Sequence, residues 1–132
     1  MISEQFLELQ TYLKEFKNQD AELQRRADGS YLVTIQGVQL PPGWTPREVE
    51  LFFVAPPGYP AAKPDCFWVS PPLRLSNGAI PQNANEGTPL PYDQRSGRSL
   101  TWFSWHLQTW DPNRSRLENF YRAIVQRLNP PR

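Results

Sequence analysis

The sequence predicts an α+β fold with an N-terminal helix, a four-stranded antiparallel meander, a long loop and a C-terminal helix. Apolar residues recur at helical spacing near both ends, and short β-prone runs separated by turn residues fill the first half. The 15 prolines among 132 residues divide the remainder into short elements and exclude a helical bundle. The length fits one domain over residues 1–132.

The first element is predicted to be an amphipathic helix over residues 3–18, a segment without glycine or proline. Its apolar positions follow one another at intervals of three and four residues, which places them on one helix face. They are Phe6, Leu9, Leu13 and Phe16. The helix should therefore cover one face of the sheet.

Four β-prone runs follow, and turn residues separate them. They lie around Leu23 and at residues 31–35, 49–54 and 66–69. Asp28-Gly29, a dipeptide typical of hairpins, joins the first two. The third run is the most continuously apolar and is expected at the centre of the sheet.

Residues 71–97 show no sustained periodicity and are rich in proline and asparagine, which predicts a long loop. One or two helical turns are expected at Trp102, Trp105 and His106. Asp111-Pro112 is a plausible start for the last helix, whose apolar stripe stops at Asn129.

The charge balance argues against two classes of partner. Lysine and arginine total 14 against 13 acidic residues, giving a formal charge of +1, so neither nucleic acid nor an anionic membrane is an expected partner. The longest apolar run, residues 51–55, is too short to span a bilayer, and the first residues lack signal-peptide features. A cytoplasmic location is therefore expected.

The candidate catalytic residues are weak. Cys66 lies in an apolar β-prone run, where a buried and inert thiol is the favoured interpretation. His106, beside several tryptophans, is more typical of a packed residue than of a general base. No Ser-His-Asp order, phosphate loop or metal cluster can be picked out, and only His106 could join Cys66 around zinc. Neither a metal nor another cofactor is expected.

A series of motifs carries a family resemblance. In order, they are Pro57-Gly58-Tyr59-Pro60 with Pro64-Asp65, then Asn77-Gly78-x-Ile80, then Trp110-x-Pro112 before a Leu-rich helix. With these motifs the chain resembles the ubiquitin-conjugating enzyme (UBC) superfamily over residues 5–131. Phe67-Trp68 and Ser104-Trp105-His106-Leu107 are similar to its prokaryotic branch, family E. The resemblance implies a UBC-like fold, with Pro60, Pro64, Trp110 and Pro112 as framework residues.

The departures from the family pattern bear on activity. Pro81 stands where catalytic members carry the thioester cysteine, and Ser70-Pro71-Pro72 replaces the stretch that supplies their oxyanion-stabilising asparagine. The resemblance therefore implies a non-catalytic adaptor in a bacterial ubiquitin-like conjugation pathway. Its partners would be the ubiquitin-like protein, its activating enzyme or the active conjugating enzyme.

Arginines and large aromatic residues of the loop and the following segment are the candidate partner-binding residues. They are Tyr92, Arg95, Arg98, Trp102 and Trp105. Two alternatives remain open. One is an unconventional conjugating enzyme that uses Cys66 or a hydroxyl of Ser76, Thr88 or Ser96 as acceptor. The other is a module that binds extended or proline-rich peptides.

Overall fold

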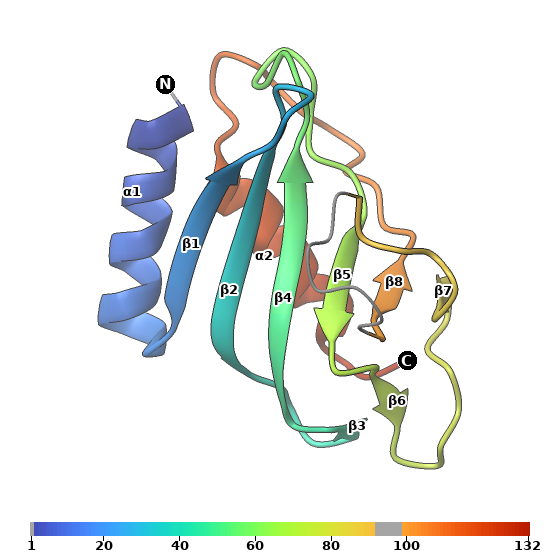
Figure 1. Cartoon of the computed structure of the whole chain (residues 1–132). Coiled ribbons are helices and arrows are strands. Elements are labelled where there is room, and N and C mark those ends of the chain that lie inside the picture. Colours follow the sequence, from blue (N-terminus) through green and yellow to red (C-terminus); the bar gives the residue numbers. More distant parts are fainter. Residues whose placement is uncertain (1, 92–98) are drawn as a thin grey trace.

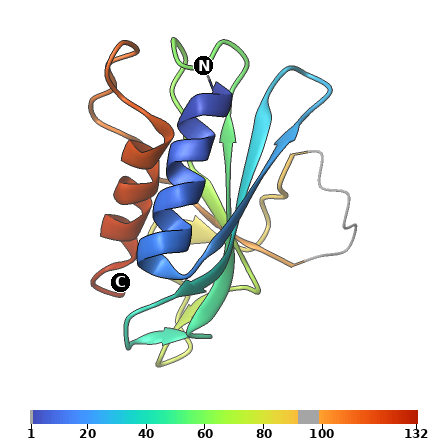
Figure 2. The same cartoon turned by 90° about the vertical axis from the view of Figure 1, so that its left-hand side faces the viewer.

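The computed structural model describes residues 2–91 and 99–132, in which two helices cover one face of an antiparallel sheet (Figures 1 and 2). The helices are α1 (Ile2–Tyr12), continued by a π-helical turn at Leu13–Lys17, and α2 (Leu117–Leu128). In spatial order the sheet contains β1 (Asp20–Arg25), β2 (Tyr31–Gln39), β4 (Glu48–Ala55), β5 (Phe67–Ser70), β8 (Thr101–Phe103) and β7 (Ala84–Asn85). A small second sheet pairs β3 (Trp44–Thr45) with β6 (Arg74–Leu75).

The main core lies between the sheet and the helices. Leu9 and Leu13 of the N-terminal helical segment are completely buried, as the amphipathic pattern predicts, whereas Phe16, assigned to the same face, is 71% exposed. Phe53 of β4 meets Phe120 of α2 edge to face, with 5.1 Å between ring centroids. Because alternate residues of β4 point to opposite faces, Leu51 and Phe53 face the helices while Phe52 faces away.

The opposite face of the sheet carries a smaller apolar cluster. Leu32, Phe52 and Trp68 of three neighbouring strands pack there against Leu90 and Leu100. The indole N–H of Trp68 donates to the carbonyl of Thr88 at 3.1 Å. Residues 88–90, which follow β7, are thereby held against the sheet on the side away from the helices (Figure 2).

The structure differs from the sequence prediction around β8. The helical turns expected at Trp102, Trp105 and His106 are wrong, because residues 101–103 form a strand between β5 and β7. Thr101 and Phe103 are completely buried while Trp102 is partly exposed, which is the two-residue period of a strand. Within the described residues the sheet consequently has six strands, of which the four predicted ones are consecutive neighbours.

The last helix also starts later than Asp111-Pro112 suggests. Asp111 belongs to a turn in which its carbonyl accepts from the backbone N–H of Arg114 at 3.0 Å. The helix begins at Leu117, whose N–H donates to the side-chain oxygen of Gln5 on α1 at 3.2 Å. The first turn of α2 is therefore capped in two ways, by Gln5 from the other helix and locally by Asn119, whose side-chain oxygen accepts from the N–H of Arg116 at 2.6 Å.

None of the helices in the described part of the chain is long and apolar enough to cross a membrane.

Candidate functional site

The position at which the resemblance expects a cysteine is occupied by a buried proline. Pro81 follows a tight turn in which Asn77 accepts a hydrogen bond from the N–H of Ala79 at 3.0 Å, and Ile80 between them is 49% exposed. Arg127 donates to the carbonyl of Gln82 at 2.6 Å. Proline has no side-chain nucleophile, so this position offers no group for thioester chemistry.

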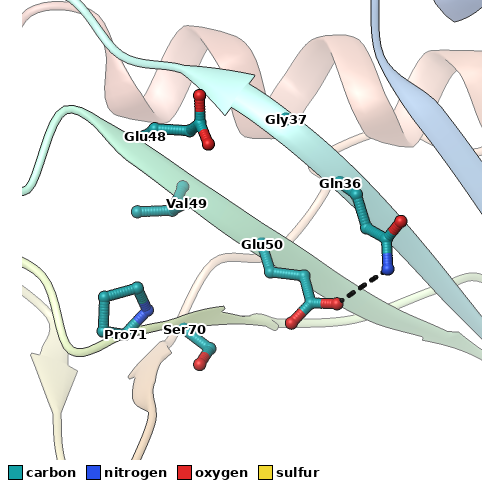
Figure 3. Close-up of a pocket in the computed structure, with 7 residues that line it drawn as sticks. All are labelled: Gln36, Gly37, Glu48, Val49, Glu50, Ser70 and Pro71. Carbon is teal, nitrogen blue, oxygen red and sulfur yellow. Dashed lines mark hydrogen bonds between the residues drawn. The ribbon is translucent and has the colours of Figure 1, made fainter.

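Next to Ser70-Pro71, the stretch that replaces the oxyanion motif, the sheet carries a shallow hollow of about 240 Å³ (Figure 3). Glu48 and Glu50 of β4 line it together with Ser70 and Gln36, which donates to Glu50 at 3.2 Å. The hollow lies on the face away from the helices, and Figure 3 shows its carboxylates projecting from that face. Carboxylates would repel a developing oxyanion, so the hollow does not replace the missing asparagine.

Cys66 is the residue immediately before β5 and not part of that strand. Its side chain is buried, its backbone adopts a left-handed φ of 60°, and its N–H donates to the carbonyl of Trp105 at 2.9 Å. Burial raises the pKa of the Cys66 thiol above its usual value, although bonds from Trp105 and Trp102 oppose the shift. At neutral pH this thiol is protonated and a poor nucleophile.

His106 is exposed, in contrast to the packed histidine expected from the sequence. Its side chain is 58% exposed, and both ring nitrogens have partners. Nδ1 shares a hydrogen bond with the Asp65 carboxylate, and Nε2 lies 3.3 Å from the hydroxyl oxygen of Ser104. A serine, a histidine and an aspartate thus form a continuous hydrogen-bonded chain.

Sequence reasoning found no Ser-His-Asp arrangement because the partners come from distant segments. Asp65 and His106 are 41 positions apart and meet because β5 and β8 are neighbours. One local signal was present: Ser104 and His106 are two residues apart in extended chain, a spacing that puts both side chains on one side. Nothing local identifies Asp65 as their partner.

Of the hydroxyls considered as acceptors of the ubiquitin-like protein, those that the structure describes lie away from His106. Ser76 is exposed in the turn after β6, where its N–H donates to the carbonyl of Gly43 at 3.1 Å. The Thr88 hydroxyl donates to the side chain of Asn85 at 2.9 Å. Ser96 lies outside the described residues. Neither Ser76 nor Thr88 belongs to the hydrogen-bonded chain of Ser104, His106 and Asp65.

Two of the five candidate partner-binding residues lie in the described part of the chain. Trp102 packs against the smaller apolar cluster, on the face of the sheet away from the helices. Trp105 lies under the guanidinium groups of Arg127 and Arg132, which are 5.8 and 5.9 Å from its ring centroid. An open groove of about 540 Å³ adjoins Trp105 and His106. Tyr92, Arg95 and Arg98 fall in residues 92–98, outside the described ranges.

Fold and motif positions together define a UBC-like protein, in which a helix-covered sheet supports an irregular segment leading into the last helix. The family model of prokaryotic E2 family E matches residues 9–130, so the chain belongs to this family of bacterial ubiquitin-conjugating (E2)-like proteins. The family associates it with ubiquitin-like conjugation and, in general terms, with ubiquitin-like proteins and their conjugation enzymes. Neither a curated protein nor a solved structure matches the chain.

Proposed function

We propose that this protein is a single-domain, non-catalytic E2-like adaptor that acts in the cytoplasm. It binds a ubiquitin-like protein, or the activating or conjugating enzyme that handles it, without forming a thioester. The observation that carries the proposal is the buried Pro81 at the expected cysteine position, within a scaffold that retains its helices and sheet.

The position of Cys66 supports the same function. On one side of the segment that follows β8, the N–H of Cys66 donates a hydrogen bond to the carbonyl of Trp105. On the other side, the carbonyl of Asn83, two residues after Pro81, accepts a hydrogen bond from the N–H of Ser104. Two strand spacings of about 4.8 Å each separate the backbones of Cys66 and Asn83 by about 10 Å. The thiol is therefore displaced from the expected site, and it is buried and protonated at neutral pH.

Binding without chemistry needs an exposed surface with residues suited to protein recognition. Trp105 with its stacked Arg132, and the groove beside them, combine an aromatic ring with positive charge. Arg95 and Arg98, which lie outside the described residues, are the further charged candidates that the sequence offers. A ubiquitin-like partner with an acidic patch would complement it.

Calorimetry and size-exclusion chromatography with the cognate ubiquitin-like protein test this proposal. We expect a 1:1 complex without ATP, unaffected by thiol reductant, with a dissociation constant of about 10 µM or tighter. The double variant Arg95→Glu/Arg98→Glu should bind at least about tenfold more weakly, since both charges are reversed.

Arg25→Glu, at an exposed position of β1, is the matched control and should bind like the parent. Equal weakening by Arg25→Glu would show a general charge effect. Failure of the ubiquitin-like protein and both enzymes to bind would refute the adaptor function.

The Ser104–His106–Asp65 chain favours a second candidate, an unconventional conjugating enzyme. In that reaction the Ser104 hydroxyl would attack the thioester carbonyl of a charged partner, pass its proton to His106 Nε2 and release the partner's thiolate, leaving an ester on Ser104. This function predicts an adduct that resists thiol reductant and disappears in Ser104→Ala.

A further inference from the structure

Three side chains of different chemistry converge at the junction between β5 and β8. Asp65, Cys66 and His106 each offer one metal-ligating atom, and these atoms all lie within 4.8 Å of one another. Ligands bound to one ion at 2.0–2.3 Å are typically about 3.5 Å apart, so only small side-chain rotations would bring the three onto a common cation. Cys66 lies on the buried side of the cluster, while the other two side chains are about half exposed.

The backbone at Cys66 accounts for the convergence. In an extended chain, consecutive side chains point to opposite sides, so Asp65 and Cys66 would diverge. The left-handed φ of 60° at Cys66 breaks this alternation. For a residue other than glycine this conformation is strained, and such strain clusters at functional sites. The hydrogen bond from the Cys66 N–H to Trp105 fixes it beside His106.

The hydrogen bonds of His106 fit a metal ligand. Ser104 lies 3.3 Å from Nε2, so an Nε2–H can donate to its hydroxyl and leave the Nδ1 lone pair toward Asp65. Histidines that bind metals generally donate their other ring N–H to such a partner. On binding, a cation would take the place of the proton between Nδ1 and the carboxylate, and in the neutral ring that proton moves to Nε2, where the Ser104 hydroxyl accepts the hydrogen bond.

We propose that Asp65, Cys66 and His106 form a binding site for a divalent transition-metal ion, with zinc as the best match. The mixed sulfur, nitrogen and oxygen donors suit zinc and do not suit Mg²⁺ or Ca²⁺, which prefer oxygen alone. Three protein ligands leave a fourth position, which the exposure of Asp65 and His106 opens to solvent. Binding converts the protonated thiol to a thiolate and releases its proton to the buffer.

No metal cluster could be picked out from the sequence, because Asp65 and His106 are 41 positions apart and meet only in the folded chain. The proposed site uses Cys66 as a ligand and does not depend on the adaptor function. Its failure would leave the partner-binding proposal standing, and the reverse also holds.

Cobalt(II) titration of the full-length, chelator-treated and reduced protein tests the site. Thiolate coordination gives a near-ultraviolet sulfur-to-cobalt charge-transfer band, and we expect this band to saturate at one equivalent. Added zinc should displace the cobalt and abolish the band, because a protein site of this kind does not bind cobalt more tightly than zinc.

Variants then identify the ligands. Cys66→Ala should lose the band. Asp65→Asn and His106→Gln should each weaken cobalt binding by about 100-fold or more, because even the loss of a residue that only hydrogen-bonds to a metal ligand weakens metal binding by about 10- to 100-fold. Ser104→Ala should weaken binding by about tenfold because it removes the partner of Nε2. Asp20→Asn, at an exposed carboxylate of β1, should bind like the parent. Circular dichroism of each variant checks that it is folded.

The absence of a charge-transfer band in the folded parent would overturn the proposal. So would parent-like cobalt affinity in Cys66→Ala, which would leave Asp65 and His106 as members of the hydrogen-bonded chain alone.

Discussion

Trp44→Ala is expected to destabilise the protein by about 4–5 kcal/mol, the largest effect anticipated for a single substitution. The Trp44 side chain is 2% exposed, packs edge to face on Phe103 at 6.4 Å, and donates its indole N–H to the carbonyl of Leu128 at 2.8 Å. Truncation would leave a large cavity and an unpaired carbonyl at the end of α2. Urea denaturation followed by circular dichroism measures the change.

Trp110→Ala is the matched comparison. The family resemblance implies a framework role for Trp110, and full burial of its ring would predict a cost of about 3–5 kcal/mol. The ring is partly exposed, lies 5.7 Å from the ring of Tyr59 and donates to the Pro60 carbonyl at 2.7 Å. We therefore expect a loss of about 2 kcal/mol. Equal losses for the two variants, or the reverse order, would contradict the packing described here.

Arg127→Ala is expected to cost about 3 kcal/mol, the second-largest effect. Arg127 is 1% exposed on α2 and donates to the carbonyls of Gln82 and Arg132 at 2.6 and 3.0 Å. Its guanidinium also lies 5.0 Å from the ring centroid of Phe103. Burial, and secondarily the charge of Arg132, lower the pKa of Arg127 to about 10. The substitution removes these bonds and leaves a cavity under the segment that carries Pro81.

Arg122→Ala, also on α2, is the control for this prediction. Arg122 is exposed and pairs with Glu118 one helical turn away at 3.2 Å. Exposed pairs of this kind contribute about 0.3–0.5 kcal/mol. A loss from Arg127→Ala no larger than that from Arg122→Ala would show that the buried guanidinium does not hold the segment in place.

Elements with strong local patterns could be predicted from sequence. The spacing of Leu9 and Leu13 predicted a helix packed on the sheet, and Asp28-Gly29 predicted the first hairpin, which the β1–β2 pairing confirms. The strand at residues 101–103 was missed because three residues are too few to display a period, and only pairing with β5 and β7 determines their conformation. The start of α2 was missed because Asp111-Pro112, which resembles a helix start, forms a separate turn, and because the contact of Leu117 with Gln5 is long-range.

The candidate site divides in the same way. Motif order along the chain assigns Pro81 to the expected cysteine position and Ser70-Pro71 to the oxyanion stretch, and these assignments stay predictions that depend on local sequence alone. The Ser104–His106–Asp65 chain could not be predicted from the sequence, because it requires the adjacency of β5 and β8. Long-range strand pairing, rather than composition, creates this part of the site.

A charging reaction tests the central claim, partner binding without thioester formation, most directly. The protein would be incubated with the cognate activating enzyme, the ubiquitin-like protein and ATP, and its intact mass measured with and without thiol reductant. We predict an unchanged mass under both conditions, for the parent and for Cys66→Ala and Ser104→Ala alike. An adduct that reductant removes and Cys66→Ala lacks would establish thioester chemistry, and a reductant-resistant adduct that Ser104→Ala lacks would establish an ester. Either adduct would contradict the non-catalytic function.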